Sequence, residues 1–189
     1  TTLVYFMNAI TPARQAFHLR ICPRVAGIIQ AFMSCYCPEL LVNRPAPPAG
    51  HPWHIVGCGR MGTLAAFYLQ RAGASVTVIR PGRPHQRRVH LRFAGDTRSQ
   101  MLALPVRPPE QVTAVTRLVV ACKTPYSAAR LAPIDLAPDA LVLRLQNGIG
   151  SLDGLLRPSQ RLIEVVTASA VKSEGPETLD VVAENETVF

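Results

Sequence analysis

Three glycines at the end of a short apolar segment have the spacing of a phosphate-binding turn. Residues 57–62 read GCGRMG and directly follow an Ile-Val dipeptide. In such a turn Gly57 permits the sharp change of direction, Gly59 lets a pyrophosphate approach the backbone, and Gly62 allows the next helix to pack closely. The N-terminus of that helix offers free N–H groups and partial positive charge to an anion. We therefore expect a dinucleotide to be held by Gly57, Cys58, Gly59, Arg60, Met61 and Gly62.

An arginine stands where a dinucleotide-binding unit that selects NAD usually carries an acid. That acid follows the glycines by about 20 residues and binds the ribose 2′-hydroxyl. Here the second strand-like segment ends in Arg80, and there is no Asp or Glu from 52 to 95. An arginine at this position suits a 2′-phosphate, because a charge-assisted hydrogen bond contributes about 1.5–3 kcal/mol. We therefore expect NADP as the cofactor, bound through Arg80, and we interpret Arg83, Arg87 and Arg88 as solvated side chains.

Two further polar residues follow segments that are typical of buried strands. Lys123 comes after 117–122, and Asn147 comes after 141–145. Ligands of open α/β sheets bind beyond the carboxyl ends of the strands. A lysine there can contact a phosphate or a substrate oxygen, and an asparagine can hold a carbonyl or hydroxyl group. A surface lysine and a turn asparagine are the ordinary alternatives, but the joint placement favours a site. We predict Lys123 and Asn147 as catalytic residues that also contact the cofactor.

Hydrophobic patterning predicts the elements that would position these residues. The glycine turn opens a helix with an apolar face that includes Leu64 and Phe67, and Gly73 is placed to end it. Shorter helices are predicted over 126–131 and 149–156. Strands are predicted over 55–56, 75–79, 117–122, 141–145, 162–171 and 179–182.

A β-hairpin takes the place of the helix that would usually follow the second strand. Residues 89–93 alternate between apolar and polar, Gly95 and Asp96 form a turn, and 101–106 is typical of a return strand. The pattern as a whole predicts a Rossmann-type, doubly wound α/β fold. Its sheet is mostly parallel, with the hairpin inserted after the second strand.

The composition limits the kinds of partner. With 48% hydrophobic and 17% charged residues, the chain of 189 residues is typical of a globular protein. Its five cysteines form no Cys-x-x-Cys pair, which argues against a metal site and favours a reducing, cytoplasmic setting. No run of about eighteen apolar residues predicts a membrane span. The net charge of +8 raises nucleic acid as a partner, but the basic run 80–92 has no interleaved aromatic residues, so we expect none.

The first 51 residues differ from the rest. They contain no acidic residue before Glu39, and 43–52 form a proline-rich linker. An acid-poor, arginine-bearing leader suits an organelle transit peptide or an amphipathic helix at a membrane surface. An unstructured extension is the simpler interpretation. We therefore predict an extension and linker over 1–51 and an NADP-binding domain over 52–189.

From about residue 53 to 189 the sequence resembles the ketopantoate reductase (2-dehydropantoate 2-reductase) family, NADPH-dependent enzymes of pantothenate synthesis. The resemblance rests on GCGRMG, on the strand end VTVIR, on the hairpin, and on ACKTP, LQNGIG and TASAVKSEGP. It implies that the three glycines hold the pyrophosphate and that Arg80 binds the 2′-phosphate. It also implies that Lys123 and Asn147 line the cleft where the nicotinamide meets a 2-oxo acid substrate.

The same family has a second, all-helical domain, which supplies a proton-donating lysine and a substrate-binding glutamate. The sequence contains no counterpart of that domain, and Lys172, in a predicted turn, does not replace its lysine. The resemblance thus implies that this chain carries the cofactor-binding half of a reduction of 2-dehydropantoate to pantoate and is incomplete for catalysis. A non-catalytic NADP-binding module or remnant is the alternative. A homodimer is left open.

Overall fold

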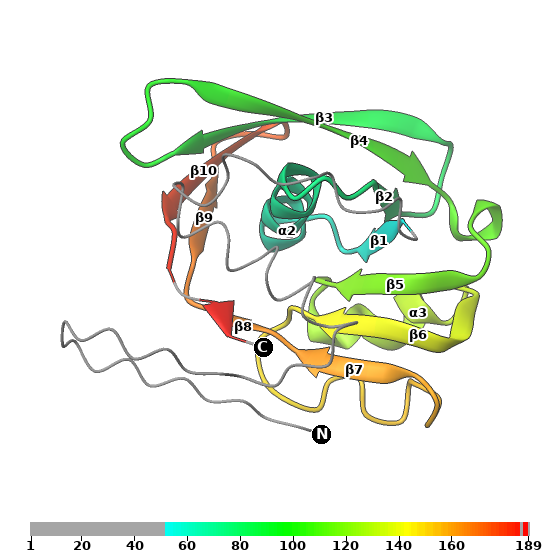
Figure 1. Cartoon of the computed structure of the whole chain (residues 1–189). Coiled ribbons are helices and arrows are strands. Elements are labelled where there is room, and N and C mark those ends of the chain that lie inside the picture. The colour runs from blue at the N-terminus through cyan, green and yellow to red at the C-terminus, as the bar shows by residue number, and fades with distance from the viewer. Residues whose placement is uncertain (1–51, 186, 189) are drawn as a thin grey trace, which may run out of the picture.

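A nine-stranded sheet organises residues 52–185 and 187–188, which are the residues that the computed structural model describes (Figure 1). The predicted extension and linker over 1–51 lie outside them. The strands are, in chain order, β1 (Trp53–Val56), β2 (Val76–Ile79), β3 (His85–Phe93), β4 (Ser99–Arg107), β5 (Val115–Val120), β6 (Leu136–Arg144), β7 (Arg161–Glu164), β9 (Ala170–Ser173) and β10 (Thr178–Ala183). A separate two-stranded sheet pairs β8 (Val166–Thr167) with β11 (Thr187–Val188).

The order of the strands confirms the predicted Rossmann-type class. Across the sheet it is β7-β6-β5-β1-β2-β4-β3-β10-β9. All the neighbours from β7 to β4 are parallel, and only the β4–β3 and β10–β9 pairs are antiparallel. The carboxyl ends of β1, β2, β5 and β6 therefore meet at one edge, where the glycine turn begins.

Helix α2 (Arg60–Arg71) starts at the glycine turn and buries its apolar side against the sheet. It ends as the sequence predicts. Gly73 has a φ of +84°, a left-handed conformation that suits glycine. The N–H groups of Gly73 and Ala74 donate to the carbonyls of Gln70 and Leu69, which satisfies two carbonyl groups of the last turn.

The predicted hairpin is confirmed, and both of its strands are longer than expected, at nine residues each. Strand β4 pairs in parallel with β2, so that Val106 lies opposite Val78. On β3, Val89 and Leu91 are fully buried and alternate with exposed residues. The hairpin thus extends the sheet where a doubly wound fold usually crosses over through a helix.

Strand β10 then pairs with the free side of β3 in parallel, with Leu179 opposite Leu91. Figure 1 shows the result: the sheet curls around α2, with β1 and β2 on one side of the helix and β9 and β10 on the other. The hydroxyl of Tyr68 on α2 donates to the carboxylate of Glu184, just beyond β10. The main core therefore lies between α2 and the concave side of the sheet.

The other face of β5 and β6 carries a second, smaller core. It is covered by the 3₁₀ helix η3 (Pro109–Gln111) and by η4 (Thr124–Tyr126), which runs into the short helix α3 (Ser127–Leu131). The buried residues of this core are Val56, Ile79, Val112, Val115, Leu118, Val120, Leu131, Ile134, Val142 and Leu152.

Two predicted elements are wrong. Residues 149–156 form turns and no helix, because Gly148, Gly150 and Gly154 have φ values of +82°, +80° and +73°, which a right-handed helix does not allow. The single strand predicted over 162–171 is divided into β7, β8 and β9, so that the chain leaves the parallel edge and reaches β10.

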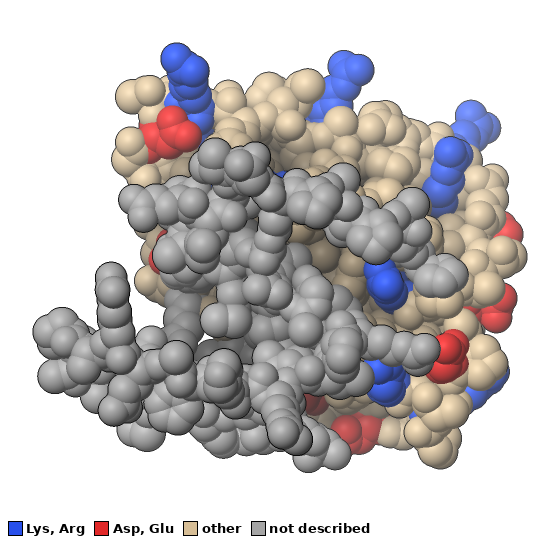
Figure 2. Space-filling model, viewed as in Figure 1, with Lys and Arg blue, Asp and Glu red and all other residues tan. Residues whose placement is uncertain are grey.

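Basic side chains are dispersed over the visible part of the face in Figure 2, with two side by side at the upper right, and acidic side chains stand among them. The visible part of this face therefore carries no continuous basic patch. No helix within the described residues is long and apolar enough to cross a membrane.

Candidate functional site

The glycine turn between β1 and α2 is held by its own backbone. Gly57 has a φ of +87°, and a Cβ atom there would lie under 3.0 Å from backbone atoms of Cys122, beyond the end of β5. At Gly62 a Cβ atom would meet the carbonyl oxygen of Gly57 in the same way. At Gly59, in contrast, a Cβ atom would meet nothing within 4 Å. Two glycines thus close the turn against β5, and the third leaves open space above the backbone.

The N-terminus of α2 faces that open space. The backbone N–H groups of a first helical turn have no intrahelical acceptors. Gly59 is the N-cap, so no side chain caps the helix, and its first turn has no acidic residue. The Thr63 hydroxyl donates to the Gly59 carbonyl at 2.6 Å, and the Cys58 thiol lies 3.4 Å from the same hydroxyl. The turn is therefore suited to an anion.

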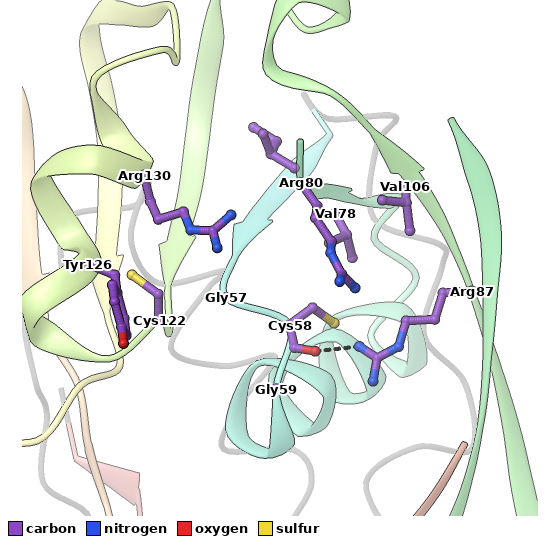
Figure 3. A pocket seen from close by; sticks show the side chains of 11 residues that line it. Gly57, Cys58, Gly59, Val78, Arg80, Arg87, Val106, Cys122, Tyr126 and Arg130 are labelled. Atoms are coloured by element: carbon purple, nitrogen blue, oxygen red, sulfur yellow. Dashed lines mark hydrogen bonds between the residues drawn. The ribbon is translucent and has the colours of Figure 1, made fainter. Parts of the chain in front are cut away.

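A pocket of about 230 Å³ lies over the turn, and three arginines point into it (Figure 3). Arg80 comes from the end of β2, Arg87 from β3 and Arg130 from α3. Within residues 52–185 and 187–188, no Asp or Glu lines the pocket; the lining residues there are Gly57, Cys58, Gly59, Val78, Ile79, Arg80, Arg87, Val106, Cys122, Tyr126 and Arg130. Its volume is below the roughly 300–1,000 Å³ of typical ligand pockets, so it suits part of a dinucleotide, such as a phosphorylated ribose.

Arg80 lies beside the glycine turn, as expected from the sequence. Its backbone N–H donates to the carbonyl of Arg107 at 2.9 Å, which fixes the start of the side chain at the edge of the sheet. The side chain is exposed and lines the pocket together with Gly57 and Gly59. The structure therefore brings together the predicted phosphate-binding glycines and the predicted 2′-phosphate residue.

Arg87 is a pocket residue that we interpreted as solvated, and that interpretation is wrong. Its Nη1 group donates to the carbonyl of Cys58 and to the hydroxyl of Thr63, the latter at 3.3 Å. The cause is the alternation of β3, which places Arg87 on the same inward face as Val89 and Leu91. That parity was visible in the sequence. Arg83 and Arg88, in contrast, are exposed as expected.

The opposite wall of the pocket comes from the segment after β5. Tyr126 and Arg130 lie one helical turn apart, and the side chain of Arg130 points across the pocket toward Arg80 (Figure 3). Pro125 occupies the first turn of η4, as the sequence predicts. Neither Tyr126 nor Arg130 was selected from the sequence, because only the fold brings α3 next to the end of β2.

Lys123 and Asn147 occupy matching positions beyond two neighbouring parallel strands. Val120 and Arg144 are register partners on β5 and β6, and Lys123 and Asn147 follow them by three residues each. Both are exposed, and neither lines the pocket. They lie on the β5–β6 side of the carboxyl edge, past the glycine turn. Arg60 and Met61, in the first turn of α2, do not line the pocket either.

A polar network ties the loop that carries Asn147 to the end of β5. The Gln146 amide donates to the Cys122 carbonyl at 2.5 Å and to the Ser127 hydroxyl at 2.8 Å. The Ser151 hydroxyl donates to the amide oxygen of Gln146 at 2.7 Å. The loop after β6 is therefore fixed relative to the backbone against which Gly57 packs.

A buried ion pair is joined to this network through Ser151. Arg144, at the end of β6, is fully buried and pairs with the carboxylate of Glu164 on β7. Its Nη1 group also donates to the Ser151 hydroxyl at 3.1 Å. Sequence reasoning missed this pair, because Arg144 is the one polar residue of the apolar segment 141–145 from which the strand was predicted.

Comparisons with known proteins identify relatives of this chain and its fold. A family described as Ketopantoate reductase PanE/ApbA matches residues 53–189. A dimeric ketopantoate reductase from Staphylococcus aureus is 25% identical with a TM-score of 0.55, over 69% of this chain and 48% of its own.

Two other solved structures share the fold. A 2-dehydropantoate 2-reductase from Geobacter metallireducens is 20% identical with a TM-score of 0.59, over 72% of this chain and 48% of its own. A D-mandelate dehydrogenase with NADH and anilino(oxo)acetate is 18% identical with a TM-score of 0.58, over 72% of this chain and 47% of its own. The chain thus spans about half the length of these relatives. Since the family match covers well over half of the 189 residues, this chain belongs to the ketopantoate reductase family.

Proposed function

We propose that this chain binds NADPH and forms the cofactor-binding half of an enzyme that reduces a 2-oxo acid. The observation that carries the proposal is the pocket at the carboxyl edge of the sheet. It joins an uncapped helix N-terminus and an open glycine turn to Arg80, and none of its lining residues in the described part of the chain is a carboxylate. A ribose 2′-hydroxyl would call for an acid at this place, whereas a 2′-phosphate calls for a cation.

The residues of the site fit such a cofactor. The open space at Gly59 gives the pyrophosphate access to the backbone, and Arg80 is placed for the 2′-phosphate. When bound, the nicotinamide supplies a hydride to the ketone carbon. The nicotinamide end would then extend toward β5 and β6, where Lys123 and Asn147 lie.

We assign Lys123 and Asn147 to the substrate side of the site. The Lys123 ammonium group can donate hydrogen bonds to the carboxylate or ketone oxygen of a 2-oxo acid, and the Asn147 amide can orient the same oxygen. Both side chains are exposed, so these residues by themselves leave water in the site. Because the relatives are about twice as long, we expect the 189-residue chain alone to turn over slowly.

We propose 2-dehydropantoate, reduced to pantoate, as the substrate, because the family match and two of the solved relatives name that reduction. The assay follows NADPH oxidation with 2-dehydropantoate, for the parent chain and for Lys123→Ala. General acid and positioning residues contribute about 10²–10⁴-fold, so Lys123→Ala should reduce any measurable rate at least tenfold. Lys172→Ala, which removes an exposed lysine on β9, is the control.

The cofactor is tested by calorimetric titration of the chain with NADPH and with NADH. We expect NADPH to bind about tenfold to hundredfold more tightly, as a charge-assisted hydrogen bond predicts. Equal affinity would overturn the assignment of NADP. Binding of neither nucleotide would overturn the proposal as a whole. NADPH binding with no turnover, even when the helical domain of a relative is supplied, would favour a non-catalytic module.

We also propose a cytoplasmic homodimer. The S. aureus relative is described as dimeric, and the two cysteines in the described residues, Cys58 and Cys122, are free thiols beside the pocket. Free thiols at a binding site suit a reducing compartment. Light scattering of the purified chain would measure its oligomeric state, and thiol trapping in intact cells would report whether Cys58 and Cys122 stay reduced.

A further inference from the structure

The β3–β4 hairpin brings a second arginine to the side of the pocket where Arg80 lies. Arg87 is half-buried, and its Nη1 group is fixed by the Cys58 carbonyl and the Thr63 hydroxyl. These two acceptors belong to the glycine turn and to the first turn of α2. The guanidinium group is therefore held in one orientation before any ligand arrives.

The rest of that guanidinium group is available. A guanidinium carries five N–H donors in a rigid fork that matches a phosphate. Within the described residues the Nε and Nη2 groups of Arg87 donate to no protein acceptor, and Arg87 makes no ion pair. Figure 3 shows its side chain reaching into the pocket from the side opposite to Arg130, with the guanidinium of Arg80 between them.

The positive charge of the pocket also suits a phosphate group that binds two arginines at once. Arg80, Arg87 and Arg130 surround a space of about 230 Å³, and the described residues contribute no carboxylate to its lining. The ion pairs of the described residues lie elsewhere, at Arg92, Arg144 and Lys172. A phosphate monoester carries a charge of about −1.5 to −2 at neutral pH, so that one such group balances two arginines.

We propose that Arg87 is a second specificity-determining residue for the 2′-phosphate, which it binds together with Arg80. The inference rests on the proposed NADPH function and adds a residue that the β2 end does not supply. The hairpin, which replaces a crossover helix, thereby becomes part of the cofactor site. The hydrogen bond from Arg87 to the Cys58 carbonyl orients the guanidinium group so that its free N–H groups face the phosphate.

The test uses two small ligands that differ only in the 2′-phosphate, adenosine 2′,5′-bisphosphate and AMP. Calorimetry gives the dissociation constant of each for the parent chain, for Arg87→Gln and for Arg87→Lys. We expect Arg87→Gln to bind the bisphosphate about 10- to 100-fold more weakly and AMP within about threefold of the parent. Arg87→Lys should lose less, since it keeps the charge but not the fork.

Arg88→Gln is the matched control. It removes the same charge from the adjacent position, and its side chain is exposed on the other face of β3. We expect both ligands to bind it as they bind the parent. An equal loss for the bisphosphate and AMP in Arg87→Gln would assign Arg87 to the shape of the glycine turn alone and would overturn the proposal.

Two other outcomes separate this inference from the proposed function. If the parent prefers the bisphosphate and Arg87→Gln keeps that preference in full, the inference fails while the NADPH assignment stands. If the parent shows no preference for the bisphosphate over AMP, both fail. Thermal melting of each variant tests whether a loss of binding comes from a loss of fold.

Discussion

The backbone of Gly57 packs directly against the backbone of Cys122, so closely that a Cβ atom on the glycine would lie under 3.0 Å from three backbone atoms of 121–122. With its φ of +87°, Gly57 is therefore fixed by both conformation and contact. We predict that Gly57→Ala lowers the melting temperature by several degrees, since backbone strain of this kind costs on the order of 1–3 kcal/mol.

Gly59→Ala is the matched control for that prediction. Its Cβ atom would enter open space, so the melting temperature should stay within about 1 °C of the parent value. The same methyl group would stand where the pyrophosphate approaches, so NADPH should bind at least tenfold more weakly. If Gly59→Ala binds NADPH as the parent does, the pyrophosphate does not lie over this residue.

Arg80→Asp should remove the preference for NADPH. The substitution replaces a donor to the 2′-phosphate with a carboxylate that repels it and can bind a free 2′-hydroxyl. We expect NADPH to bind at least tenfold more weakly and NADH to bind equally well or better, as measured by calorimetry. Arg83→Asp makes the same change of charge at an exposed residue outside the pocket and should keep the preference.

Much of the fold could be predicted from the sequence because its signals are local. The glycine turn, α2 and the hairpin each follow from residues within about thirty positions of one another. The predicted helix over 149–156 was wrong because the apolar spacing outweighed two glycines inside it, Gly150 and Gly154, whose left-handed conformations form turns. Periodicity alone does not distinguish these two outcomes.

The candidate site was predicted in part, for a similar reason. Gly57 and Arg80 belong to a known spacing along one β-α-β unit, whereas Arg130 reaches the pocket only because α3 folds over the edge of the sheet. Arg87 could have been found from its parity with Val89 and Leu91 on β3. The burial of Arg144 could not, because its partner Glu164 lies twenty residues away on another strand.

Glu164→Ala should destabilise the fold strongly. Removing the carboxylate leaves Arg144 as an unpaired charge with 0% of its side chain exposed. Breaking a buried pair in this way costs about 3–5 kcal/mol, which lowers the melting temperature by on the order of 10 °C.

Asp180→Ala provides the comparison. It breaks the Arg92–Asp180 pair, whose side chains are 51% and 22% exposed, and an exposed pair contributes about 0–1 kcal/mol. Equal effects of the two substitutions would show that burial of Arg144 carries no special cost. The double variant Arg144→Met with Glu164→Leu should recover much of the stability lost in Glu164→Ala.

His54 should make the stability of the fold depend on pH. Burial in β1 lowers the pKa of its side chain from the ordinary value, and a backbone hydrogen bond at Arg117 only partly opposes this effect. The folded protein thus binds the proton less well than the unfolded chain. The stability that the fold has with His54 neutral is fully present above about pH 6.5 and is lost as the pH falls below that value.

Urea unfolding at pH 7.5 and at pH 5.5 would measure the effect. In the parent, the free energy of unfolding should be lower at pH 5.5 than at pH 7.5, and this difference should be smaller in His54→Gln. His90→Gln, at an exposed position on β3, should show the same difference in free energy of unfolding between the two pH values as the parent. If His54→Gln also shows the parent's difference, groups other than His54 cause the pH dependence of stability.

The pairing of β3 with β10 has a consequence for how the protein is made. Arg92 and Asp180 lie opposite each other on these strands, yet they are 88 positions apart in the chain. During synthesis the edge of β3 therefore remains unpaired until nearly the whole domain has left the ribosome. Because such distant pairings form slowly and exposed strand edges associate with other chains, we expect the nascent protein to depend on chaperones until β10 emerges and pairs with β3.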